Sequence, residues 1–113
     1  MAEFCGAFPV LAGRGAAVRK FAEDCLARKA EFAASLKGQG VSCERWWFQE
    51  DVDAGGQLFL YFEAADIGRA FEVFATSSDP FVVWQREEML AFSGVDVTEP
   101  GPPPPEKIFD ITV

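Results

Sequence analysis

Histidine and asparagine are both missing from this chain of 113 residues. Without histidine the chain has no His-ligated haem, no His-containing zinc site and no Ser/His or Cys/His catalytic pair. Acid–base chemistry therefore falls to Glu, Asp, Lys, Tyr or Cys side chains. No metal and no cofactor is expected.

Cysteine and long apolar runs are also scarce. The three cysteines, Cys5, Cys25 and Cys43, form no CxxC motif, and their odd number is typical of reduced thiols in a cytoplasmic protein. The segment 1–5 has no basic region of the kind that opens a signal peptide. No stretch approaches the ~20 apolar residues that cross a membrane. We expect a cytoplasmic protein with no membrane partner.

Positive charge is in short supply. Ten Lys and Arg residues face 18 Asp and Glu residues, which gives a formal charge of −8. Such a surface repels phosphate backbones and anionic lipids, so the sequence argues against nucleic acid as a partner. The simplest role of this charge is solubility.

Aromatic residues, by contrast, are plentiful, with twelve Phe and three Trp, and half of the chain is apolar. This composition predicts one folded domain. Hydrophobic spacing predicts a strand over 4–10, a long helix over 16–37 that ends at Gly38 and Gly40, and helices over 67–76 and 80–92. Asp66 and Asp79 are expected as N-caps, the second with Pro80 in the first helical position.

A predicted hairpin, 41–50 and 57–64, is apolar on both of its faces. A strand that meets water on one face alternates apolar and polar residues, and this one does not. Pairing Phe48 with Leu60 places one set of side chains toward the helices: Trp46, Phe48, Leu58, Leu60 and Phe62. The mixed face then carries Cys43, Arg45, Trp47, Gln49, Phe59, Tyr61 and Glu63, with Arg45 opposite Glu63.

The predicted domain spans residues 1–97, a proline-rich linker spans 98–105, and residues 106–113 supply a last strand of the same domain. The resulting order, β-α-β-β-α-(α)-β, predicts an α+β, ferredoxin-like fold with an antiparallel sheet and helices on one face. Both faces of the hairpin need cover, so a second copy of the chain, a ligand pocket or both are expected on the open side.

Five residues are candidates for ligand binding: Arg45, Trp47, Tyr61, Glu63 and Trp84. The first four combine aromatic walls with orienting polar groups on the mixed face. Dimer packing or a surface ion pair would explain the same residues. Glu31 is a weaker candidate for a base and Arg86 for an entrance residue. Gly13–Gly15 lacks the context of a phosphate-binding loop.

Several segments together resemble a family of short uncharacterised bacterial proteins in the dimeric α/β-barrel superfamily. They are Arg28–Ser35 leading into 41–50, Ser78–Trp84, Gly94–Asp96, and the proline run before Ile108–Asp110. The resemblance implies a homodimer in which two sheets close into a barrel with a pocket in each subunit. The superfamily includes cofactor-free monooxygenases, lactone isomerases, haem-handling enzymes and stress-responsive proteins, and fold membership does not choose among them.

Two functions stay open at this point. The chain is either a dimeric module that binds a small apolar or aromatic metabolite, as a cofactor-free oxygenase or isomerase would, or a non-catalytic, stress-related dimer whose mixed face serves only dimerisation.

The hairpin generates a direct prediction about assembly. Because apolar side chains occupy both of its faces and the helices cover only one, we expect light scattering at micromolar concentration to give twice the mass of the 12.4-kDa chain. A monomer under those conditions would contradict the prediction.

Overall fold

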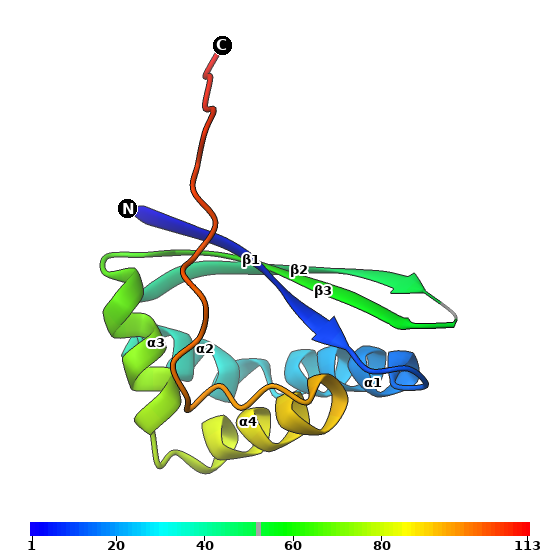
Figure 1. Cartoon of the computed structure of the whole chain (residues 1–113). Helices are drawn as coiled ribbons and strands as arrows, with labels where there is room; N and C mark the ends of the chain where they lie inside the picture. The colour runs from blue at the N-terminus through cyan, green and yellow to red at the C-terminus, as the bar shows by residue number, and fades with distance from the viewer. Residues whose placement is uncertain (52) are drawn as a thin grey trace.

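The computed structural model describes residues 1–51 and 53–113 and shows an open, antiparallel sheet covered by helices on one side (Figure 1). The elements follow the chain as β1 (Ala2–Val10), α1 (Gly15–Ala27), α2 (Lys29–Gly38), β2 (Val41–Asp51), β3 (Gly55–Ala64), α3 (Ile67–Thr76) and α4 (Pro80–Ser93). The α+β class, the antiparallel sheet and the single helix layer agree with the sequence prediction.

The sheet has the order β1-β3-β2, so β3 lies in the centre. The strand β3 begins with two glycines, Gly55 and Gly56, whose φ angles are 90° and 137°. A side chain at Gly55 would place its Cβ 1.8 Å from the carbonyl oxygen of Val10. Glycine is therefore needed at this position both for its backbone conformation and for the close approach of β1.

The observed hairpin register differs by two residues from the predicted one. Phe48 lies opposite Leu58 and Trp46 opposite Leu60, so Arg45 lies opposite Tyr61; the predicted pairing of Arg45 with Glu63 is wrong. A shift of two residues preserves which face each side chain occupies. The predicted division into a helix-facing side and a mixed side is therefore confirmed.

A β-bulge interrupts β2 near its start. Val41 pairs with Ala64 and Cys43 with Glu63, which leaves Ser42 as the extra residue. The bulge lets Val41 face the helices, where it is buried, while Cys43 faces the open side.

The long helix predicted over 16–37 is two helices, separated at Arg28. Arg28 has φ −105° and ψ 38°, outside the α-helical range. Its guanidinium lies 4.8 Å from the ring centre of Phe81 and 4.9 Å from that of Trp84. These cation–π contacts with α4 fix the side chain at the point where the helix breaks.

The other helix boundaries follow the sequence signals. The Asp66 side chain accepts a hydrogen bond from the backbone N–H of Arg69, and Asp79 accepts one from that of Phe81. Pro80 occupies the first turn of α4, and Gly94 ends this helix with a left-handed φ of 72°. Both predicted N-caps are confirmed.

Phe21 of α1 stands at the centre of the main hydrophobic core. Its ring stacks on Trp46 of β2 with centroids 5.5 Å apart and planes 2° from parallel, and it also contacts Trp84 and Phe92 of α4. A second cluster at the other end of the sheet joins Phe4 and Phe62 to Phe71 of α3. The two clusters attach the helix layer to one face of the sheet.

The last strand, predicted over 106–113, is absent from the sheet that the structure describes. Residues 106–113 form no strand within the chain's own sheet, and they lie exposed to solvent beyond it (Figure 1). The Lys107 ammonium contacts the Glu3 carboxylate at the start of β1, so the chain has already passed along the domain before the apolar segment begins. Residues 108–113 therefore begin near the first residue of β1, and little of that strand's edge lies further along their path.

Within the part of the chain that the structure describes, no helix has both the length and the apolar character needed to cross a membrane.

The position of Phe21 generates a prediction about stability. Phe21→Ala should lower the free energy of unfolding by about 3–5 kcal/mol, because it removes a fully enclosed ring and leaves a cavity. Leu26→Ala is the matched control, since Leu26 lies on the same helix but is exposed, and it should cost less than about 0.5 kcal/mol. Chemical denaturation measures both, and equal effects would contradict the proposed core.

Candidate functional site

A cavity of about 80 Å³ lies between the helix-facing side of the sheet and the helices. Its walls come from all three strands, from all four helices, and from the segments that follow α2 and α4. The lining is mostly aromatic and aliphatic, and includes Phe8, Phe21, Phe32, Leu36, Val41, Trp46, Leu58, Leu60, Phe62, Ala70, Phe71, Phe74, Met89 and Val97.

Three polar side chains also line this cavity: Gln39, Glu44 and Gln85. Gln39 donates from Nε2 to Ser35 Oγ at 2.9 Å, and Gln85 donates from Nε2 to Cys25 Sγ at 3.7 Å. The Gln39 amide is thus held by the helix that it follows, α2, and the Gln85 amide by α1. Glu44 is the only carboxylate among the lining residues described.

Glu44 is positioned by the alternation of β2, which turns it to the same face as Trp46 and Phe48. Burial in this apolar setting raises the pKa of its carboxyl to about 7. Trp46 Nε1 donates to Glu44 Oε2 at 2.9 Å, which favours the charged form and opposes part of that increase. None of the ion pairs found among residues 1–51 and 53–113 includes Glu44.

This arrangement has a defined chemical capacity. A carboxyl group with a pKa near neutrality exists in both protonation states at physiological pH, so it can take up and return a proton. An apolar cavity with a few convergent polar groups is also the usual setting of a small-molecule site.

Four of the five residues predicted to bind a ligand lie together on the opposite, open face of the sheet. The Arg45 guanidinium lies 5.7 Å from the ring centre of Tyr61, its partner across the two strands, and Arg45 Nη1 is 3.0 Å from Cys43 Sγ. Trp47 is 56% exposed on this face, and Glu63 lies opposite Cys43. None of these residues lines the cavity.

Tyr61 is engaged with the edge of the sheet. Its hydroxyl donates to Glu3 Oε2 at 2.7 Å, and this hydrogen bond is the main reason that the pKa of Tyr61 rises to about 12. Glu3 also contacts Lys107, and the pKa of the Glu3 carboxyl is lowered by these two partners. The open face therefore carries a row of polar groups, from Tyr61 through Glu3 to Lys107, in addition to the exposed Trp47.

Trp84, the fifth predicted residue, packs inside the helix layer against Phe21 and Phe81 at centroid distances of 5.3 and 5.7 Å. Arg86, the weaker candidate, donates from Nη1 to the carbonyl oxygen of Phe74 at 2.7 Å. Both side chains make contacts that hold the helices together, and the structure does not bring them to the open face.

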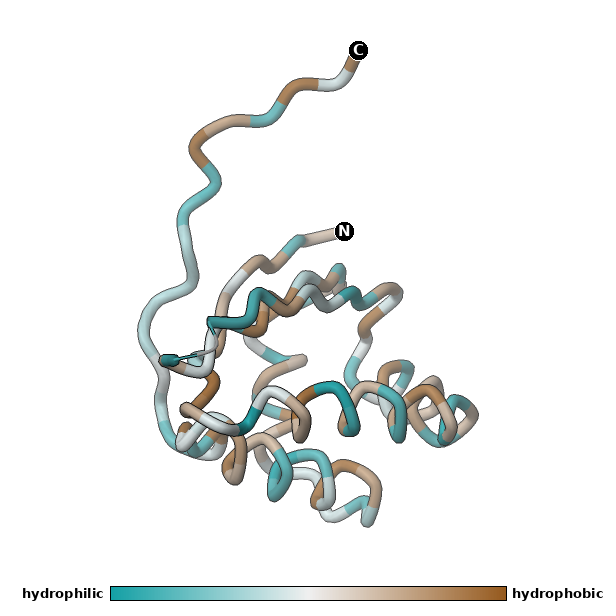
Figure 2. Tube along the Cα trace, turned by 90° about the vertical axis from the view of Figure 1, so that its right-hand side faces the viewer, coloured by the Kyte–Doolittle hydropathy of each residue, from teal (hydrophilic) through white to brown (hydrophobic). Residues whose placement is uncertain are grey.

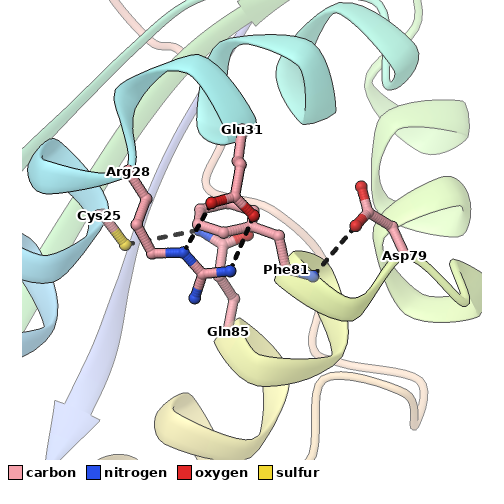
Figure 3. Close-up of polar contacts among 6 residues, drawn as sticks. All are labelled: Cys25, Arg28, Glu31, Asp79, Phe81 and Gln85. Atoms are coloured by element: carbon pink, nitrogen blue, oxygen red, sulfur yellow. Dashed lines mark hydrogen bonds and ion pairs between the residues drawn. The ribbon is translucent and has the colours of Figure 1, made fainter.

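Glu31 faces solvent on α2, where Arg28 holds it with two hydrogen bonds of 3.1 and 2.8 Å (Figure 3). This pairing lowers the pKa of the Glu31 carboxyl, so it is a poor base and does not reach the cavity. Figure 3 also shows Cys25 beside Gln85. Burial raises the pKa of this thiol to about 11, which keeps it protonated and unreactive.

Sequence reasoning missed Glu44, Gln39 and Gln85. A signal for Glu44 was present: two-residue alternation places it in phase with Trp46 and Phe48, and a carboxylate in the apolar phase of a strand is an exception. Gln39 follows α2 directly and Gln85 lies within α4, and neither has a comparable signal.

Comparison with known proteins returned no matching family model, no matching curated protein and no matching solved structure. Among the residues that the structure describes, no group of three or more Cys, Asp or Glu side chains is placed to hold a metal ion.

The buried carboxyl generates a prediction about pH. The pKa of Glu44 is higher in the folded chain than the ordinary 4.5, so folding favours the protonated form. This contribution to stability is fully present below about pH 4.5 and is lost as the pH rises through about 7, on the order of 3 kcal/mol in total.

Glu44→Gln should remove this dependence. The free energy of unfolding of the variant relative to wild type should therefore increase as the pH rises from 5 to 8, as measured by urea denaturation at each pH. Glu63→Gln, on the open face, is the control and should follow the wild-type profile. Parallel profiles for wild type and Glu44→Gln would show that Glu44 does not titrate in this range.

Proposed function

We propose that this protein binds a small apolar or aromatic molecule in the cavity between sheet and helices, with Glu44 as its polar anchor. The observation that supports this function is one carboxyl group, with a pKa near 7, that faces a largely apolar cavity. A buried carboxyl without a charged partner weakens a fold, and such arrangements cluster at functional sites.

The size of the cavity limits the ligand. Its volume of about 80 Å³ is smaller than the roughly 150 Å³ that holds a benzene ring. A ring-sized ligand therefore requires the lining to move. Met89 and Phe71 are suited to this, because Met89 has a flexible side chain and Phe71 is already 39% exposed.

The chemistry that this anchor supports is proton transfer. In an isomerase, Glu44 would take a proton from one carbon of the ligand and return it to another. In a cofactor-free oxygenase, the same proton abstraction would activate the ligand toward molecular oxygen. Both reactions use a base with a pKa close to the working pH and an environment that excludes water.

The proposed assembly is a homodimer of ferredoxin-like subunits that meet through the open faces of their sheets. Trp47, Phe59 and Tyr61 give this face its apolar character, and Trp47 is more than half exposed. The alternative function, a non-catalytic dimer, is supported by the same face together with the small size of the cavity. The two functions differ in whether the cavity takes up a ligand.

Phenol and toluene are suitable probes, because one carries a hydroxyl group for Glu44 and the other does not. We expect NMR titration of wild type to show phenol perturbing the cavity residues, with affinity that increases about tenfold as Glu44 ionises between pH 6 and 8. Toluene should show little pH dependence, and Glu44→Gln should remove that of phenol.

Two further variants locate the site. Ala70→Leu fills the cavity and should abolish binding, whereas Glu63→Gln changes only the open face and should leave binding unchanged. Loss of binding in Glu63→Gln but not in Ala70→Leu would move the site to the open face. If wild type binds neither probe, the small-molecule function is wrong and the non-catalytic dimer is favoured.

A further inference from the structure

We infer that the C-terminal segment, residues 108–113, docks as an added strand on the β1 edge of a second copy of this chain. The inference rests on the homodimer proposed above but not on the cavity, and it assigns this segment a partner that its own subunit does not offer.

The segment has the pattern of a half-buried strand. Phe109, Ile111 and Val113 alternate with Asp110 and Thr112, so an extended chain presents one apolar face and one largely polar face. In the single chain both are in solvent: Phe109 is 77% and Ile111 70% exposed. Figure 2 shows the C-terminal end of the chain, with hydrophobic positions in brown, extending away from the sheet and the helices. Side chains of this kind require a surface to cover them.

The chain's own sheet is poorly placed to supply that surface. Lys107 contacts Glu3, the second residue of β1, so the tail has reached the beginning of that strand before its apolar part starts. From there residues 108–113 run away from the sheet (Figure 1). Pairing with their own β1 would require the tail to reverse direction directly after Lys107.

A second copy resolves this geometry. Its β1 is an edge strand, since in the sheet described β1 pairs with β3 alone. In a two-fold dimer the contact is reciprocal, so a tail that leaves one subunit beside the start of β1 can reach the same strand of the other. Strand addition would satisfy backbone groups that an open edge leaves unpaired.

Charge and composition favour the β1 edge over that of β2. The strand β2 carries Glu44, Glu50 and Asp51, whereas β1 carries Glu3 as its sole acidic residue, and the tail itself brings Asp110. Pro9 lacks a backbone donor near the other end of β1, which leaves the half that begins at Ala2 better suited to pairing.

A matched pair of substitutions tests the docking. Ile111→Asp places a charge on the apolar face of the segment, and Ile108→Asp makes the same change on the opposite face. By sedimentation equilibrium, Ile111→Asp should weaken the dimer at least about tenfold, and Ile108→Asp should weaken it less than about threefold. Because both residues lie in an exposed tail, neither change should prevent the subunit from folding.

The outcomes separate the two proposals. A wild-type dimer that neither variant weakens, or that both weaken equally, overturns the docking and leaves the homodimer standing. A monomeric wild type overturns both the docking and the homodimer, while binding of phenol in the cavity remains a separate result.

Cross-linking identifies which copy receives the strand. Cys5 is exposed on β1, and adjacent strands lie within disulfide distance. In a Cys43→Ser background, cysteine is placed in turn at positions 109 to 113 and the protein is oxidised. A disulfide between Cys5 and the tail of another chain, identified by peptide mapping, supports the inference. The same disulfide within one chain, or none at any position, overturns it.

Discussion

The structure depends on one constraint: a three-stranded sheet with aromatic side chains on both faces has helices over only one of them. The stacked pair of Phe21 and Trp46 marks the side that the helices take. This one-sided cover gives the two faces of the sheet different surroundings. The covered side encloses a cavity, and the uncovered side retains an exposed Trp47 beside a strip of polar groups. The two sides of the sheet therefore differ in character, and the proposed function gives the covered side a small molecule and the open side a second copy of the chain.

Glu44 shows how the covered side combines stability with function. A hydrophobic residue in its place would suit the core better, because the carboxyl group loses its hydration without gaining an ionic partner. Only the Trp46 indole offers it a hydrogen bond among the residues described. A buried carboxyl without an ionic partner weakens the core, and the proposed function gives this group a role in binding that would explain its presence.

Sequence reasoning recovered the elements whose signals are local. Asp66 and Asp79 fixed two helix starts, and the division of the hairpin into two faces was correct because an error of two residues in register leaves the faces unchanged. The break at Arg28 could not be predicted, since apolar residues of α1 and α2 continue the same helical phase across it, and the contacts of Arg28 with α4 are tertiary. The exposed aromatic and polar residues of the open face could be predicted from strand alternation, whereas the cavity is created by tertiary packing of seven elements and has no local signal. A last strand was expected over 106–113 from the alternation of apolar and polar residues. Alternation predicts an extended segment with one apolar face, but it does not identify the strand with which that segment pairs.

The bulge at Ser42 has a meaning for how this chain can change in length. Upstream of it, odd-numbered Val41 faces the helices; downstream, the even-numbered residues do. Deleting Ser42 would restore a regular ladder and would leave Val41 opposite Ala64, still facing the helices, because Val41 would then directly precede Cys43. Insertions and deletions elsewhere in β2 would exchange its two faces and send Glu44 into solvent. The bulge thus divides β2 into two parts. Residues can be lost at the bulge itself without changing which side chains face the helices, whereas from Cys43 onward the number of residues determines that Glu44 faces the cavity.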